Sequence, residues 1–164
     1  MVTSVLSDDQ LGAVHLLLDR IRVRQLQDFG QIGSDVKPDG SLITDCDRWS
    51  DAALVEGLAS ISPGEGVLSE EGSKTVPNTR AYWVVDPLDG TQNFCKGLPI
   101  SCVSIGLVVD GVPTLGIVYD PYRDELFLGI ALKGLMERTR GTAHSRLLHY
   151  IAQVVPDTAK LAPI

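Results

Sequence analysis

A run of acidic, glycine and hydroxyl residues carries the clearest chemistry in this sequence: Asp86-Pro87-Leu88-Asp89-Gly90-Thr91. Its two carboxylates stand close together, and the residues from Thr91 onward can open a helix. Carboxylates hold hard cations, while the free N–H groups at a helix start can face a phosphate. Oxygen ligands favour magnesium, manganese or calcium over zinc. The run predicts a metal ion beside an anion, although two consecutive turns explain such a motif as well when it stands alone.

A second acidic pair, Glu70-Glu71, lies upstream, directly after the short β-rich run Val67-Leu68-Ser69. By itself, this pair is better explained as solvated loop acids. Four carboxylates brought to one place would repel one another strongly unless a cation lay among them. The two pairs together therefore favour a metal site over two unrelated acidic loops.

Capping signals and apolar spacing predict the helices that must help to position these acids. Ser7-Asp8-Asp9-Gln10 and Thr44-Asp45-Cys46-Asp47 have the form of capping boxes, which begin helices. The apolar spacing behind them predicts one helix that ends near Gly30 and another that ends near Ser62.

The strands follow from β-rich runs over residues 81–85, 102–109 and 112–119, and the first would deliver Asp86 to its end. Asp110-Gly111 predicts a tight hairpin, and Pro113 predicts an edge strand or a bulge. Two helices followed by several strands, without strand–helix alternation, predict an α+β fold. We expect helices layered on a mostly antiparallel sheet.

The composition argues against several classes of function. The 164 residues carry 14 Lys and Arg against 21 Asp and Glu, a net charge of -7, so no nucleic-acid partner is expected. The longest nearly apolar stretch, residues 99–109, is about half of what a bilayer crossing needs, so no membrane partner is expected either. The first residues show no secretory signal pattern, which makes the cytoplasm the expected location. The three cysteines lack metal-ligand spacing, so free thiols are expected.

Taken together, the motifs resemble the N-terminal half of the inositol monophosphatase family of magnesium-dependent, lithium-sensitive phosphomonoesterases. The resemblance covers about residues 7–130 and runs through four stretches, residues 37–47, 68–72, 83–94 and 118–127. It implies the N-terminal domain of the sugar-phosphatase fold.

The resemblance also implies roles for individual residues. Glu70, Asp86 and the main-chain carbonyl of Leu88 would hold one magnesium ion, and Asp86 and Asp89 a second, with manganese as a substitute. Gly90 and Thr91 would bind the substrate phosphate, next to Glu70, Leu88 and Asp89.

The same resemblance implies a group that activates water. The hydroxyl of Thr91, paired with Asp47, would orient and deprotonate the attacking water. Glu71 would be a further catalytic acid near the metals. For Asp47 alone, a helix cap is the simpler explanation.

The sequence departs from the family beyond residue 130. The family's second domain carries a Trp-Asp motif, and no Trp-Asp pair follows Asp89 here. Residues 131–164 hold five basic and two acidic residues and predict one helix near 142–155. We therefore expect a metal- and phosphate-binding domain over 1–130 and an atypical basic tail over 131–164, with the family's C-terminal domain missing and turnover reduced or absent.

The leading hypothesis is a magnesium-dependent phosphomonoesterase that hydrolyses inositol or sugar monophosphates, with a small phosphate monoester as its partner. One alternative is a truncated, noncatalytic remnant that binds metal or a protein partner, including a homodimer formed through exposed apolar surface. A further alternative, a phosphoadenosine phosphate phosphatase, is favoured weakly by Leu68-Ser69-Glu70-Glu71 and disfavoured by Asn93-Phe94.

Overall fold

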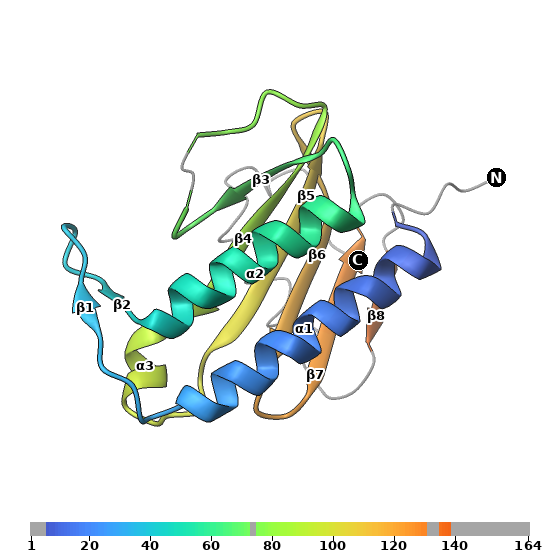
Figure 1. The fold of residues 1–164 in the computed structure, drawn as a ribbon. Helices are drawn as coiled ribbons and strands as arrows, with labels where there is room; N and C mark the ends of the chain where they lie inside the picture. The colour runs from blue at the N-terminus through green and yellow to red at the C-terminus, as the bar shows by residue number, and fades with distance from the viewer. Residues whose placement is uncertain (1–5, 73–74, 131–134, 139–164) are drawn as a thin grey trace.

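The computed structural model describes residues 6–72, 75–130 and 135–138. Helices α1 (Asp8–Asp28) and α2 (Asp45–Ile61) lie side by side over one face of a six-stranded sheet (Figure 1). The expected α+β fold, with helices layered on a mostly antiparallel sheet, is confirmed. No helix in the described part of the chain is long and apolar enough to span a bilayer.

Both helices begin at the capping boxes that the sequence predicts. Ser7 accepts a hydrogen bond from the N–H of Gln10 and donates its own N–H to the Gln10 side chain. Thr44 and Asp47 exchange the same pair of bonds at the start of α2. These bonds satisfy N–H groups that the first helical turn leaves without a partner.

The sheet has the order β3-β4-β5-β6-β7-β8. Its strands are β3 (Gly66–Ser69), β4 (Ala81–Asp89), β5 (Cys102–Val109), β6 (Val112–Asp120), β7 (Glu125–Ile130) and β8 (Leu135–Arg138). All neighbours pair antiparallel except β3 and β4, which are parallel with Ser69 opposite Val85. This one parallel pair brings the ends of β3 and β4 to the same edge of the sheet.

The hairpin between β5 and β6 turns at the predicted dipeptide. Asp110 and Gly111 have φ angles of 52° and 76°, the left-handed values that a two-residue turn of this kind requires. The register shifts between Leu107 and Val108, and Val108 lies opposite Pro113. Pro113 was predicted to lie on an edge strand or at a bulge. The register shift shows the bulge, and neither β5 nor β6 is an edge strand, because each has a neighbour on both sides.

Three features of the sheet differ from the sequence predictions. Strand β4 was expected to end at Asp86, but it continues through Pro87 to Asp89, with a register shift between Asp86 and Asp89. Strand β7 was not expected, because a short apolar run without alternation has no distinctive period. Strand β8 lies within the stretch expected to be an atypical tail and pairs with β7. The helix expected near 142–155 lies outside the described residues.

The core lies between the helices and the sheet. Leu18 and Ile21 of α1 and Leu54 of α2 are at most 1% exposed and meet the buried sheet residues. The largest of these is Trp83 of β4, which is fully buried. Burial of one such side chain stabilises the fold by roughly 1.5–3 kcal/mol, so the core holds β4 firmly beneath the helices.

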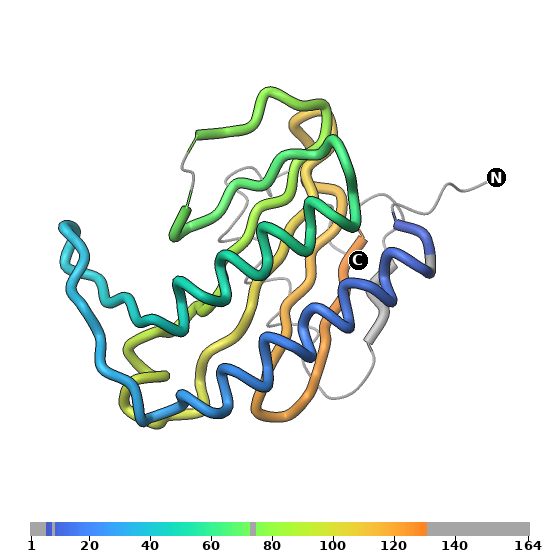
Figure 2. Tube along the Cα trace, viewed as in Figure 1, coloured from blue at the N-terminus to red at the C-terminus, as the bar shows by residue number. Residues whose placement is uncertain are grey.

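A small hairpin and a short helix stand at one end of the molecule. The hairpin consists of β1 (Asp35–Val36) and β2 (Leu42–Ile43), and it precedes α2 directly. Helix α3 (Thr91–Cys95) lies against β2, and the chain trace shows hairpin and helix together beyond the start of α2 (Figure 2). A second apolar cluster fixes this end through Cys46, Leu88 and Phe94. All three cysteines are free thiols, as expected.

Candidate active site

The end of β4 supplies most of the predicted site. The carboxylate of Asp86 accepts the main-chain N–H of Leu88 at 3.1 Å, which curls the strand end around Pro87. The Pro87 carbonyl in turn accepts a hydrogen bond of 2.9 Å from the buried side chain of Gln25 on α1. Local hydrogen bonds and a helix side chain together hold this irregular backbone in place.

Gly90 joins β4 to α3 in a backbone conformation that only glycine adopts without strain. Its φ is +96°, and a Cβ atom placed there would lie 2.7 Å from the carbonyl oxygen of Ile100. The chain can therefore turn sharply from Asp89 into Thr91. Asn93 donates to the same carbonyl at 2.9 Å, so the segment after α3 is tied to this turn.

Thr91 and Asp47 meet although they lie far apart in the sequence. The Thr91 hydroxyl is 2.8 Å from one carboxylate oxygen of Asp47 and 3.1 Å from the carbonyl oxygen of Leu88. The other Asp47 oxygen accepts the main-chain N–H and the hydroxyl of Thr44. Asp47 is 1% exposed. The same carboxylate thus caps α2 and contacts the predicted catalytic threonine.

Glu70 and Glu71 directly follow β3, and the parallel pairing with β4 brings them to the site. The Glu70 N–H donates to the carbonyl of Val85 at 3.1 Å, which extends that pairing by one residue. The ammonium group of Lys37, from the loop of the small hairpin, lies 2.6 Å from a Glu71 oxygen and 3.2 Å from a Glu70 oxygen. Lys37 therefore ties the hairpin to both acids.

Burial and neighbouring charges shift the pKa values of Asp86, Glu71 and Lys37. Burial, followed by the charges of Glu70 and Asp89, raises the pKa of Asp86 to about 8. Burial also raises the pKa of Glu71, although Lys37 opposes this shift. Burial alone would lower the pKa of Lys37, but hydrogen bonds to the two glutamates outweigh it and raise that pKa. Keeping these buried carboxylates charged lowers the stability of the fold, and a bound cation would offset that loss.

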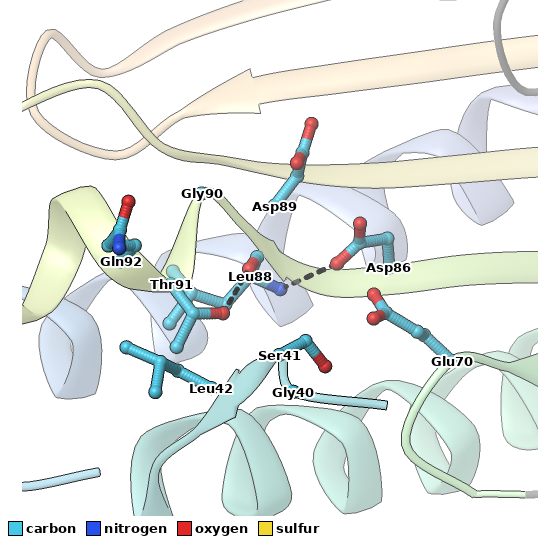
Figure 3. Close-up of a pocket in the computed structure, with 10 residues that line it drawn as sticks. All are labelled: Gly40, Ser41, Leu42, Glu70, Asp86, Leu88, Asp89, Gly90, Thr91 and Gln92. Atoms are coloured by element: carbon cyan, nitrogen blue, oxygen red, sulfur yellow. Dashed lines mark hydrogen bonds between the residues drawn. The ribbon is translucent and has the colours of Figure 1, made fainter. Parts of the chain in front are cut away.

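A pocket of about 400 Å³ opens over these residues. Six predicted site residues line it, namely Glu70, Asp86, Leu88, Asp89, Gly90 and Thr91. Gly40, Ser41 and Leu42 of the small hairpin and Gln92 of α3 complete the wall (Figure 3). Asp47 and Glu71 lie behind the wall and touch the site through Thr91 and Lys37.

The donor set suits a hard cation, because it consists of carboxylate oxygens and one carbonyl oxygen. Figure 3 shows Glu70 turned toward Asp86, whereas the side chain of Asp89 points away from Glu70. Among the described residues, no three acidic, histidine or cysteine side chains already stand at metal-ligand spacing. The chemistry fits a magnesium-like ion, and the carboxylates would have to draw together around it.

Several residues of this region were not singled out as site residues from the sequence. Lys37 contacts both glutamates, Gln25 holds the Pro87 carbonyl, and Asp51 lies buried one helical turn after Asp47. Asp51 could have been noticed from its spacing, because residues i and i+4 share a helix face. Lys37 and Gln25 reach the site only through tertiary contacts.

Comparison with known proteins gives one consistent family. The family described as "Inositol monophosphatase family" matches residues 2–154. The chain is 39% identical to the inositol-1-monophosphatase of Synechocystis sp. over 107 residues, 65% of this chain and 35% of that protein. It is 34% identical to the histidinol-phosphatase of Mycobacterium tuberculosis over 144 residues, 87% of this chain and 55% of that protein.

A solved structure agrees with these relatives. The IMPase of Thermotoga maritima superposes with a TM-score of 0.72 at 25% identity, over 81% of this chain and 52% of that one. The chain thus spans between a third and just over half of the length of the relatives named here. Because the matched family covers most of the sequence and a relative and a fold agree with it, this chain belongs to the inositol monophosphatase family.

Proposed function

We propose that this chain carries the metal- and phosphate-binding half of a magnesium-dependent phosphomonoesterase. The observation that carries the proposal is the hydrogen bond from Thr91, in the wall of a pocket also lined by Glu70, Asp86 and Asp89, to Asp47 behind that wall. A hydroxyl group paired with a buried carboxylate beside clustered acids is what hydrolysis by an activated water needs. Family membership supports the same reaction class.

In this proposal, Glu70, Asp86 and the Leu88 carbonyl would hold one magnesium ion, and Asp86 and Asp89 would hold a second. Bound magnesium supplies positive charge that polarises the phosphate ester and lowers the pKa of water. Manganese has similar ligand preferences and could replace it. The raised pKa of Asp86 supports this assignment, because burial and then the negative charges of Glu70 and Asp89 disfavour its charged form, which a cation would stabilise.

Thr91 and Asp47 orient the attacking water and accept its proton. With the Thr91 hydroxyl donating to Asp47, the hydroxyl oxygen remains free to accept a hydrogen bond from water. Asp47 is held by the N-terminus of α2, which fixes the direction of the hydroxyl. Gly90 and Thr91 line the pocket, and their main-chain N–H groups would bind the phosphate oxygens. Glu71, which is paired with Lys37, is proposed as a further catalytic acid beside the metal ligands.

The proposed substrate is a small phosphate monoester of inositol or a sugar. The two relatives named above are an inositol-1-monophosphatase and a histidinol-phosphatase, so related chains act on different organic groups. An adenosine phosphate is the alternative substrate. A noncatalytic metal-binding or self-associating protein is the second candidate function, because three acids do not yet stand at metal-ligand spacing among the described residues.

Two measurements test the proposal. Magnesium at about 100 times its dissociation constant should stabilise the folded protein by roughly 2.7 kcal/mol, seen as a rise in Tm. Asp86→Asn should remove that rise, while Asp110→Asn, at an exposed acid far from the pocket, should keep it.

Phosphate release from inositol, sugar and adenosine phosphates, with and without lithium, would then identify the substrate. Absence of any Tm shift with magnesium, manganese or calcium would contradict the metal site, and a shift without phosphate release would favour the noncatalytic candidate.

A further inference from the structure

Asp51 is a buried carboxylate on α2 whose contacts lie on the segment that follows β3. It is 8% exposed and lies one helical turn beyond Asp47. Its carboxylate accepts hydrogen bonds from the Ser69 hydroxyl and from the main-chain N–H of Glu71. Asp51 therefore bridges α2 to the two residues on either side of Glu70.

The same network continues to Gly72. The Gly72 N–H donates to the Ser69 hydroxyl oxygen at 3.0 Å. A Cβ atom at Gly72 would lie 2.6 Å from that oxygen and 3.1 Å from an Asp51 oxygen. Glycine at this position lets the chain close tightly over the buried carboxylate. On the other side, Glu70 donates its N–H to Val85. The backbone of residues 69–72, which we call the glutamate turn, is thus held from both β4 and α2.

Burying the Asp51 carboxylate at this position lowers the stability of the folded protein. One Asp51 oxygen is buried with no hydrogen-bond partner among the described residues, and the negative charge of Glu70 is nearby. Burial of a charge or polar group without full pairing lowers stability. A residue that served only to join α2 to β3 would do so better if it were apolar. The contacts of Asp51 fall instead on the main chain that carries Glu70 and Glu71.

We infer that Asp51 is a positioning residue, which fixes the glutamate turn so that Glu70 faces Asp86 across the pocket. This inference rests on the proposed function and deepens it by assigning a supporting residue to the metal ligands. Asp47 and Asp51 lie on the same side of α2, one turn apart. One rigid helix thereby sets both the Thr91–Asp47 pair and the glutamate turn, and so fixes their relative positions.

The test compares Asp51→Ala with Glu56→Ala, a matched change at an exposed acid on the same helix. In metal-free protein, amide hydrogen exchange at Glu71 and Gly72 should accelerate in Asp51→Ala and stay unchanged in Glu56→Ala. Magnesium affinity, measured by calorimetry, should fall about 10- to 100-fold in Asp51→Ala only, as for other residues that support metal ligands. Asp51→Asn, which keeps an acceptor oxygen, should recover most of that affinity.

Ser69→Ala provides a second probe if Asp51→Ala does not fold, because it removes the hydroxyl that links Asp51 to Gly72. It should also weaken magnesium binding and loosen the Gly72 amide. Unchanged magnesium affinity in a folded Asp51→Ala or Ser69→Ala protein would overturn the inference while the proposed function stands. Failure of the parent protein to bind any divalent ion would overturn the proposed function, and this inference with it.

Discussion

At the scale of single residues, Asp47 shows that one carboxylate can cap a helix and contact Thr91 at the same time. One oxygen accepts the N–H and hydroxyl of Thr44, and the other accepts the Thr91 hydroxyl. The sequence left the cap and the catalytic role as alternatives. The structure places both contacts on one side chain, because a carboxylate has two oxygens that accept in different directions.

The contribution of Lys37 to stability should depend on whether a metal ion is bound at the site. Its side chain is 13% exposed, and its partner Glu71 is 6% exposed, so this pair is largely shielded from solvent. The contact with Glu70 is longer, at 3.2 Å, and Glu70 is half-exposed. Lys37 thus supplies positive charge to the two glutamates, as the proposed metal ion would do when it is bound.

We predict that Lys37→Met lowers the free energy of unfolding of the metal-free protein by about 1.5–3 kcal/mol, because a buried glutamate loses its charged partner. Urea denaturation with a chelator measures this loss, and saturating magnesium should reduce it. Arg80→Met, which breaks the exposed pair with Asp110, should change stability little and serves as the control. An equal loss with and without magnesium would show that Lys37 and the ion do not interact.

At the scale of elements, the junction from β4 into α3 determines where the site residues point. Strand β4 keeps its pairing up to Asp86, shifts register, and pairs again at Asp89 before Gly90 turns the chain. The irregular stretch places Leu88 and both aspartates in the wall of the pocket. The site is therefore built on the end of a buried strand, with the turn at Gly90 setting its geometry.

We predict that Gly90→Ala destabilises the protein by more than Gly64→Ala. Both glycines have nearly equal φ angles, +96° and +93°, but only at Gly90 would a Cβ atom meet neighbouring atoms, whereas at Gly64 none lies within 4 Å. Gly64→Ala therefore reports the φ penalty alone, of order 1 kcal/mol. Thermal or urea unfolding measures both. Equal losses would mean that the close approach to Ile100 is relieved without cost.

At the scale of the whole molecule, the site gathers negative charge into a chain that is already acidic, with a net charge of -7. Burial is the first cause that raises the pKa values of Asp86, Asp51 and Glu71. The folded protein consequently holds protons that the unfolded chain, with acid pKa values near 4, has already released. The core between helices and sheet must offset this cost when no cation is bound.

We predict that the metal-free protein loses stability as the pH rises from 5 to 8. Over this range the folded state binds more protons than the unfolded state, so the free energy of unfolding falls as those protons leave, up to the Asp86 pKa of about 8. Urea denaturation at several pH values with a chelator measures the slope. Asp86→Asn and saturating magnesium should each flatten it. A parent protein whose stability is constant or rises over this range would contradict the prediction.

Much of the local structure could be predicted from the sequence. Both capping boxes, the Asp110-Gly111 turn and the bulge at Pro113 appear where the residues indicate, because each depends on a few neighbours along the chain. The sequence also indicated that Glu70, Asp86 and Asp89 would lie together, and they line one pocket, while their role as metal ligands stays a prediction. Strand β7 was missed, because a short apolar run has no distinctive period.

The sequence by itself determined which residues could do chemistry and which family carries them. Only the tertiary structure decided how they meet: the parallel pairing of β3 with β4 sets Glu70 beside Val85, Lys37 reaches the glutamates from the small hairpin, and Asp51 reaches the glutamate turn from α2. Such contacts join segments far apart in the chain. They depend on how whole elements pack around a shared core, which no local pattern of residues specifies.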